Sequence, residues 1–178
     1  MMGKRMIEVY KFCPNCGKPL NPEKNSKFFD CSFCGFHYYI TSYPTCGAIL
    51  ENENGEILMV ERKNEPKAGF WDIPGGFVDL NENLEAALVR ELKEEIGIIA
   101  DRLIYIGSST DLYPYKDVIY ITICALYSGK ISGKIYPADD VASYKFFNKK
   151  NFPKEYLIRP YLSSLKILYW ILFSTVFQ

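Results

Sequence analysis

Three glutamates near the middle of the chain, Glu91, Glu94 and Glu95, have the residue type and the spacing of a metal site. They stand at positions i, i+3 and i+4, so they share one face if the segment is helical. The apolar residues of the same segment recur at helical spacing and form a stripe beside Glu91 and Glu95: Leu84, Leu88, Leu92 and Ile96. Carboxylates that converge on the inward edge of a helix repel one another and lose hydration, at a cost on the order of several kcal/mol unless cations offset it. The hard, oxygen-preferring ions Mg²⁺ and Mn²⁺ would do so, whereas the alternative is a solvated acidic face.

Four cysteines near the N-terminus have the spacing of a second kind of metal site. Cys13, Cys16, Cys31 and Cys34 form two Cys-x-x-Cys pairs separated by fourteen residues, each pair followed by a glycine. Thiolates at this spacing can close a tetrahedron around Zn²⁺ and so supply folding energy to a segment too short for its own core. The first ten residues are charged and show no secretory signal, which favours a cytoplasmic location and a metal site over disulfides. His37, the only histidine, is not needed as a fifth ligand.

The elements that must position these groups follow from the apolar patterns and the turn residues. Strands are predicted at about 45–50, 56–62, 103–107, 118–127 and 144–147, and a helix at about 82–96. Asn81 is the predicted N-cap of this helix and Gly97 its C-terminal stop. Strands interrupted by one helix indicate a mixed α+β domain. We expect a zinc-binding unit at 1–42 and the main domain at 43–178.

The segment around the three glutamates matches a known motif at each of its defined positions. The matching residues are Gly76, Glu82, Arg90, Glu91, Leu92, Glu94, Glu95, Gly97 and Ile98. Over these 23 residues the chain resembles the Nudix box of Nudix hydrolases. The resemblance implies the Nudix fold, an α/β/α sandwich with a mixed β-sheet. It also implies an enzyme that uses water and a divalent cation to cleave a nucleoside diphosphate linked to another moiety.

The resemblance assigns a role to each matching residue. Glu91, Glu94 and Glu95 would bind Mg²⁺ or Mn²⁺, together with the backbone carbonyl of Gly75. Arg90 would pair with the first glutamate of the box and orient the metal-binding carboxylates rather than touch the substrate. A pyrophosphate is strongly charged, so cations that neutralise its oxygens and lower the pKa of the attacking water suit this reaction.

The general base has two kinds of candidate. Glu91 is one of them. The other is an acid on a later loop: Asp140, ahead of an aromatic strand, resembles the loop acid of the family but is one methylene shorter than the usual glutamate. Its neighbour Asp139 is the substitute if Asp140 does not reach, and a solvated turn acid is the alternative reading of both.

The sequence offers only a few candidate residues for substrate selection. A four-cysteine zinc ribbon before a Nudix domain is similar to NADH pyrophosphatases and to ADP-ribose pyrophosphatase-like proteins, although the SQPWPFPxS signature of the former is absent. Pro114, sixteen residues beyond Ile98, resembles an indicator of ADP-ribose hydrolysis, and Tyr115 resembles one of dinucleoside polyphosphates. Tyr113 and Tyr115 could stack on a base or ribose, and Arg62 could reach a phosphate. Ordinary packing of the tyrosines and a surface salt bridge of Arg62 are the alternatives.

The composition of the whole chain limits its partners. The 178 residues include 21 basic and 21 acidic ones, and this zero net charge argues against a general binder of polyanions. The lysines of the zinc ribbon show few aromatic stacking partners in an obvious platform, so nucleic acid is not an expected partner. The uncharged stretch 167–178 has about half of the roughly 20 residues that cross a bilayer. We expect it to form an apolar helix packed on the domain or on a second subunit rather than to contact a membrane, and packing on a second subunit is compatible with a homodimer.

These features together predict a hydrolase that splits the pyrophosphate of ADP-ribose, or of a related dinucleotide such as NADH, into AMP and a phosphorylated remainder. An enzyme that removes modified nucleoside triphosphates is one alternative. A non-catalytic, ligand-sensing regulator with the Nudix fold is another, although all the carboxylates of the box are present.

Overall fold

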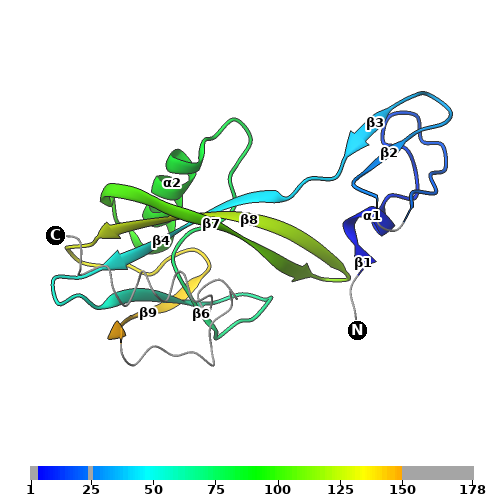
Figure 1. The fold of residues 1–178 in the computed structure, drawn as a ribbon. Coiled ribbons are helices and arrows are strands. Elements are labelled where there is room, and N and C mark those ends of the chain that lie inside the picture. The colour runs from blue at the N-terminus through cyan, green and yellow to red at the C-terminus, as the bar shows by residue number, and fades with distance from the viewer. Residues whose placement is uncertain (1–3, 24–25, 150–178) are drawn as a thin grey trace. The chain divides into compact units, whose positions relative to one another are not determined.

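The computed structural model describes residues 4–23 and 26–149 (Figure 1). The chain divides into two compact units. The first unit comprises Met1–Tyr43 and Leu112–Thr122, and the second comprises Pro44–Asp111 and Ile123–Gln178. The division at 1–42 and 43–178 stays a prediction of the domain organisation, and it did not include the segment 112–122 that groups with the first unit.

The first unit has short elements around an aromatic core. Its elements are β1 (Lys4–Arg5), α1 (Met6–Val9), β2 (Phe28–Asp30) and β3 (His37–Tyr39). Strands β2 and β3 form an antiparallel hairpin, and Phe29 on its inner face is buried against the rings of Tyr10 and Tyr38, at 5.2 and 5.5 Å between centroids. Strand β1 pairs in parallel with β8 (Val118–Lys130), from Lys4 opposite Val118. A unit of so few residues has a small hydrophobic core, and a bound metal or another cross-link is the usual additional source of stability for such a unit.

The second unit is built on a β-sheet. Its other elements are β4 (Tyr43–Glu51), β5 (Ile57–Arg62), β6 (Trp71–Asp72), α2 (Leu84–Ile96), β7 (Asp101–Tyr115) and β9 (Val141–Phe147). The strand order is β8-β4-β5-β6, with β7 beside β8 and β9 beside β5. β5 is antiparallel to β4, β6 and β9, whereas β1 is parallel to β8, so the sheet is mixed. The predicted α+β class is confirmed.

Helix α2 covers one face of this sheet. The apolar stripe of the helix, Leu88, Leu92 and Ile96, is fully buried and packs against alternate residues of the central strands. Those strand residues are Ala48, Leu50, Leu58 and Val60, whereas Ile49, Ile57 and Met59 point to a second cluster on the opposite face. This alternation follows from the period of two in a strand. The sheet therefore fixes which face of α2 is inward and thereby where its glutamates lie.

The ends of α2 only partly match the prediction. The helix begins after Asn83, whose side chain accepts a hydrogen bond from the backbone N–H of Ala86 at 2.8 Å, so the predicted N-cap Asn81 is wrong. Asn81 instead has a φ of 65° in the preceding turn. At the other end Gly97 is confirmed as the stop, in the left-handed conformation and donating to the last carbonyls of the helix.

Two further predictions concern the β7–β8 hairpin and the C-terminal segment, and the structure describes only the first of these. The hairpin of β7 and β8 is longer than predicted, because β7 runs from Asp101 to Tyr115. The predicted apolar C-terminal helix at 167–178 lies outside the described residues. Within the described ranges no helix has the length and hydrophobicity that crossing a membrane requires.

Candidate active site and metal centres

The double-glycine loop between β6 and α2 is held against strand β4. The backbone N–H groups of Ala48 and Cys46 donate to the carbonyls of Pro74 and Gly76, at 3.0 and 2.9 Å. Gly75, between them, has a φ of +136°, and a Cβ on it would lie 2.3 Å from the carbonyl oxygen of Cys46. Only glycine fits this position, because both the backbone conformation and the close approach exclude a side chain. The loop is thus a fixed edge against which the helix packs.

Glu95 is buried next to this loop. Its residue is 6% exposed, and the backbone N–H of Gly75 donates to its Oε2 at 2.8 Å. The pKa of Glu95 is raised to about 9, chiefly by burial and also by the charges of Asp140, Glu91 and Asp72, against the lowering effect of the Gly75 N–H. With no cation nearby, this carboxyl therefore holds a proton at neutral pH. A bound dication would favour the charged form instead.

Glu91 lies one helical turn before Glu95 and faces the same loop. Its side chain is 14% exposed, and a Cβ on Gly76 would lie 2.5 Å from its Oε1. Burial raises the pKa of Glu91, the hydrogen bond from Arg90 lowers it, and the charges of Glu94 and Asp140 raise it. Gly76 therefore leaves room for the carboxylate of Glu91 at the surface of the loop.

Arg90 connects the carboxylates of this helix. Its guanidinium donates from Nε and Nη2 to the two oxygens of Glu82, at 3.1 and 2.9 Å, and from Nη1 to Glu91 and Glu94, at 2.8 and 3.1 Å. Nη2 also donates to the carbonyl of Phe77 at 3.0 Å. These hydrogen bonds, that of Glu82 first, raise the pKa of Arg90, and they lower that of Glu82. The arrangement suits the orienting role that the resemblance implies for Arg90.

The loop acid is brought to the same place from a distant part of the chain. The backbone N–H groups of Tyr136 and Ala138 donate to the carbonyls of Ile96 and Glu95, at 3.0 and 2.9 Å, and so attach the loop before β9 to the end of α2. Asp140 at the end of this loop is half-buried, and its charge raises the pKa of both Glu91 and Glu95. Asp139 is exposed and has a φ of +51°. Of the two predicted loop acids, Asp140 is the one near the glutamates.

The oxygen donors at this place suit a hard cation. Glu91, Glu94, Glu95 and Asp140 contribute carboxylates, and among the described residues Arg90 is the one cation that forms ion pairs with the glutamates. Carboxylates and carbonyls without sulfur or imidazole are the ligands that Mg²⁺ and Mn²⁺ prefer. The residues therefore fit the implied ions, and which atoms bind them stays a prediction. Glu94, about half exposed, is the carboxylate most open to solvent.

One further carboxylate was missed in the sequence. Asp72, at the end of β6, is 3% exposed, accepts a hydrogen bond from the N–H of Ile73 at 2.9 Å, and contributes to the raised pKa of Glu95. Its position three residues before the double glycine was the available signal. The residue lies outside the box, so the motif did not include it.

The predicted substrate residues are placed as follows. Arg62 ends β5 opposite Val141, next to Asp140 in the chain, and its Nε donates to the carbonyl of Pro66 at 3.1 Å. Tyr113 and Tyr115 lie in the first unit, with nearly parallel rings 6.5 Å apart. The structure thus brings Arg62 to the end of the sheet that carries Asp140. A contact between a nucleotide and the two tyrosines stays a prediction.

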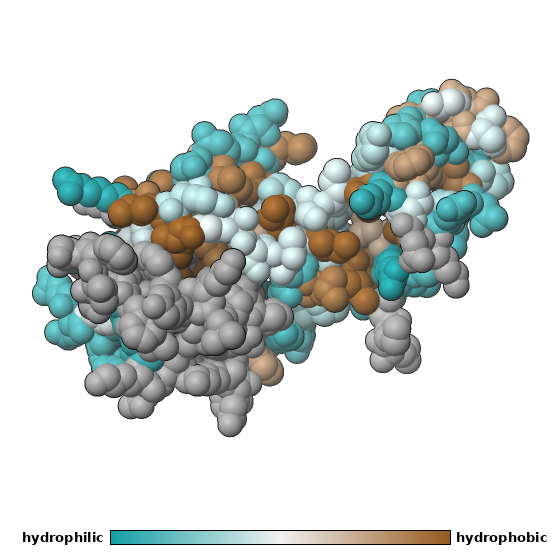
Figure 2. Space-filling model, in the orientation of Figure 1, coloured by the Kyte–Doolittle hydropathy of each residue, from teal (hydrophilic) through white to brown (hydrophobic). Residues whose placement is uncertain are grey.

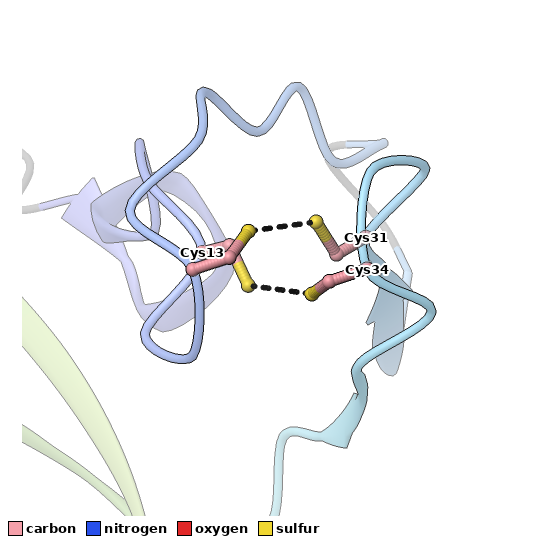
Figure 3. Close-up of side chains that lie close together, drawn as sticks. Cys13, Cys31 and Cys34 are labelled. Atoms are coloured by element: carbon pink, nitrogen blue, oxygen red, sulfur yellow. Dashed lines mark hydrogen bonds between the residues drawn. The ribbon is translucent and has the colours of Figure 1, made fainter.

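The four cysteines converge in the first unit (Figure 3). Their sulfur atoms all lie within 4.8 Å of one another, with Cys13 and Cys34 at 3.8 Å and Cys16 and Cys31 at 3.6 Å. A tetrahedron of sulfurs about 2.3 Å from Zn²⁺ has edges of about 3.8 Å, so the cluster has the size of a zinc site. Hydrogen bonds from Asn15 and from the backbone of Phe36 lower the pKa of Cys34 to about 6, which favours the thiolate.

His37 is engaged elsewhere, as expected. Its Nδ1 lies 2.6 Å from Oδ1 of Asp30, on the exposed side of the β2–β3 hairpin. Within the described ranges, the group of metal-binding side chains found here consists of cysteines alone. The cluster therefore matches the predicted four-cysteine ribbon.

Comparison with known proteins gives the same picture. A profile of the NUDIX domain matches residues 42–163. The ADP-ribose pyrophosphatase of Methanocaldococcus jannaschii is 35% identical over 134 residues, which are 71% of this chain and 77% of that protein. The NAD-capped RNA hydrolase NudC of Pseudomonas aeruginosa is 31% identical over 130 residues, 73% of this chain and 44% of that protein. The chain thus spans about half the length of the NAD-capped RNA hydrolases that it matches.

A solved structure supports the fold. The crystal structure of a NUDIX hydrolase from Nitrosomonas europaea matches with a TM-score of 0.62 and covers 94% of each chain. The two sequences are 21% identical, so this likeness concerns the fold alone.

Proposed function

Because the chain belongs to the NUDIX family, we propose that it is a metal-dependent pyrophosphohydrolase whose substrate is ADP-ribose or a related dinucleotide such as NADH. The observation that carries this proposal is the burial of Glu91 and Glu95 against the double-glycine loop, where the charge of Asp140 also acts on both. Two of these carboxyls have a raised pKa because they are buried near like charges. Such a cluster is costly unless it binds cations, and perturbed carboxyls of this kind concentrate at functional sites.

The substrate class is supported by what the relatives act on. The relative from Methanocaldococcus jannaschii is an ADP-ribose pyrophosphatase, and that from Pseudomonas aeruginosa acts on NAD-capped RNA. Both molecules contain a pyrophosphate that joins adenosine to a second ribose. In ADP-ribose or NADH, cleavage of that pyrophosphate would release AMP and a phosphorylated remainder, whereas in NAD-capped RNA the adenosine monophosphate would stay as the 5′ end of the RNA.

Each residue of the site would have its own part in the reaction. Glu91, Glu94, Glu95 and the carbonyl of Gly75 would hold Mg²⁺ or Mn²⁺. When bound, these ions neutralise phosphate oxygens and lower the pKa of the attacking water. Arg90 keeps the carboxylates in place, because its hydrogen bonds to Glu91 and Glu94 fix their oxygens.

The general base is one of two carboxylates. Asp140 and Glu91 both border the cluster, and either could accept the proton of the attacking water. Arg62, at the same end of the sheet as Asp140, would bind a phosphate oxygen of the substrate. Tyr113 and Tyr115 would stack on its base or ribose.

Turnover of defined substrates tests this proposal. The purified chain with Mg²⁺ should convert ADP-ribose to AMP and ribose 5-phosphate, identified by mass spectrometry. Glu94→Gln and Glu95→Gln should lower the turnover at least about a hundredfold without unfolding the protein. Glutamine at 95 can still accept the Gly75 N–H, so the variant removes the charge and keeps the hydrogen bond. Glu53→Gln, the same change at an exposed position in the turn between β4 and β5, is the matched control.

The outcomes separate the alternatives. A small effect in both box variants would reject the assigned roles. Pyrophosphate as the product from nucleoside triphosphates, with no turnover of ADP-ribose or NADH, would favour a sanitation enzyme. Nucleotide binding without turnover of any of these would favour a ligand-sensing regulator.

The first unit would bind structural Zn²⁺ through its four cysteines. Support comes from the sulfur separations of 3.6 and 3.8 Å. A homodimer and a cytoplasmic location stay predictions from the sequence. Light scattering and fractionation of cells would test them.

A further inference from the structure

The β2–β3 hairpin of the first unit exposes one of its faces. Phe28 stands opposite Tyr39 and Asp30 opposite His37, so these four side chains share a face, which we call the ring face. Phe29, between them, points to the other face and is buried. Phe28 and Tyr39 are 42% and 61% exposed. In Figure 2 the first unit carries brown and tan residues among teal ones.

The rings of this face are in contact with one another. The centroid of Phe28 lies 5.1 Å from that of His37 and 5.8 Å from that of Tyr39, and His37 and Tyr39 are 4.5 Å apart. The hydrogen bond between His37 and Asp30, at 2.6 Å, fixes the imidazole ring. The result is a set of preorganised rings on a small sheet, open to solvent on one side.

The first unit carries more basic than acidic residues, seven lysines and arginines against four aspartates and glutamates. Lys27 directly precedes Phe28 and is exposed, as are Lys11 and Lys18 in the first cysteine turn. None of these three lysines takes part in an ion pair of the described residues, whereas Asp30 is paired with His37 and Asp117 with Lys4. Asp30 keeps a carboxylate on the ring face, hydrogen-bonded to His37, so the attraction of anions falls to the exposed lysines, Lys27 beside Phe28 first.

We propose that the ring face binds single-stranded nucleic acid, with unpaired bases stacked on Phe28 and Tyr39 and phosphates near Lys27. Exposed aromatic rings beside lysines form the usual platform for unpaired bases, since every base offers a flat face and the backbone is anionic. Aromatic residues are also common at protein interfaces, so it is the exposed Lys27 beside the rings that favours an anionic partner with flat bases here. The platform was not visible in the sequence, because the pairing of β2 with β3 decides which aromatic residues share a face.

Binding of a labelled oligonucleotide tests the proposal. The probe is a fluorescein-labelled 15-nucleotide oligouridylate, which forms no duplex, titrated with the full chain at 150 mM salt and followed by anisotropy. Tyr39→Ala and Phe28→Leu should each weaken binding about tenfold. Tyr39→Phe keeps the ring and should bind like the unchanged protein. Lys27→Gln should reduce the slope of log affinity against log salt by about 0.7.

Phe33→Ala is the matched control. Phe33 lies in the second cysteine turn and is 65% exposed, more than either platform residue. Its removal should leave the affinity unchanged. The zinc content and the circular dichroism of each variant show that the first unit is folded.

Three results would overturn the inference. The first is that the wild-type protein does not bind the probe at micromolar concentration. The second is that Tyr39→Ala and Phe33→Ala bind the probe with equal affinity. The third is that Tyr39→Ala loses self-association although the probe binds neither the variant nor the wild-type protein. The last result would assign the ring face to a second copy of the chain. ADP-ribose turnover is measured on the same proteins, and an inactive chain that binds the probe would reject the proposed hydrolase but support the ring face.

Discussion

Replacing Gly76 with alanine tests whether the position of the Glu91 carboxylate controls turnover. The added Cβ would lie 2.5 Å from Oε1 of Glu91 and 2.6 Å from its Cδ. Ordinary contacts begin at 3.4 Å, so the carboxylate must retreat by about 0.9 Å. A displacement of about 1 Å at a reacting centre costs on the order of a hundredfold in rate. We therefore expect Gly76→Ala to lower the turnover of ADP-ribose about a hundredfold.

The same variant should remain stable. The atoms that the new methyl group meets belong to the end of a flexible side chain, and the backbone of Gly76 has no positive φ. Alanine also lowers the entropy of the unfolded chain, which offsets part of a weakened hydrogen bond between Arg90 and Glu91. We expect the free energy of unfolding to change by less than about 1.5 kcal/mol.

Gly75→Ala is the matched contrast. A Cβ there would lie 2.3 Å from the carbonyl oxygen of Cys46 and 2.7 Å from the Cα of Gly47, which are backbone atoms of the buried strand β4. These atoms cannot move aside without disturbing the sheet, and the φ of +136° adds backbone strain. We expect a loss of at least about 3 kcal/mol in the free energy of unfolding.

The two variants are compared by urea unfolding, followed by circular dichroism, and by the initial rate of AMP release with Mg²⁺. The affinity for Mn²⁺, measured by electron paramagnetic resonance, gives a second readout that does not depend on turnover. If Gly76→Ala kept more than about a third of the rate, the placement of Glu91 would not limit the reaction. If it lost as much stability as Gly75→Ala, the Glu91 side chain would be less able to move than the structure indicates.

Two further predictions concern the metal of the first unit and the acid end of the pH range. Removing zinc with a strong chelator should release one ion per chain, measured by plasma mass spectrometry. It should also abolish the near-ultraviolet circular dichroism of the aromatic cluster around Phe29, because so small a core needs the metal to stay folded. An unchanged spectrum would contradict this prediction. Hydrogen bonds from Arg90 lower the pKa of Glu82 below its usual 4.5, so the carboxylate contributes stability that is present above that pH and is lost as the pH falls below it. The urea midpoints of the unchanged chain and of Glu82→Gln should therefore differ most at pH 7 and converge toward pH 3, and a difference that grows in acid would refute the assigned sign.

Part of the site could be predicted because it depends on residues close together in the chain. The glutamates of the box share one face of α2 through helical periodicity alone, and Gly97 ends the helix through its own conformational freedom. The cysteine pairs are recognisable because a zinc tetrahedron requires short loops of fixed length. The predicted N-cap Asn81 was wrong because the true cap, Asn83, is the same residue type and the turn before the helix decides which asparagine caps it.

The remaining features depend on contacts between distant segments. Asp140 joins the glutamates because the N–H of Ala138 donates to the carbonyl of Glu95, 43 residues earlier in the chain. Asp72 is buried there because β6 pairs with β5, and the ring face exists because β2 pairs with β3 in one register. The sequence by itself determined the metal-binding residue types and their helical spacing, since these are local properties. Only the tertiary structure decided which carboxyls are buried together, because burial and register are properties of the whole packed sheet.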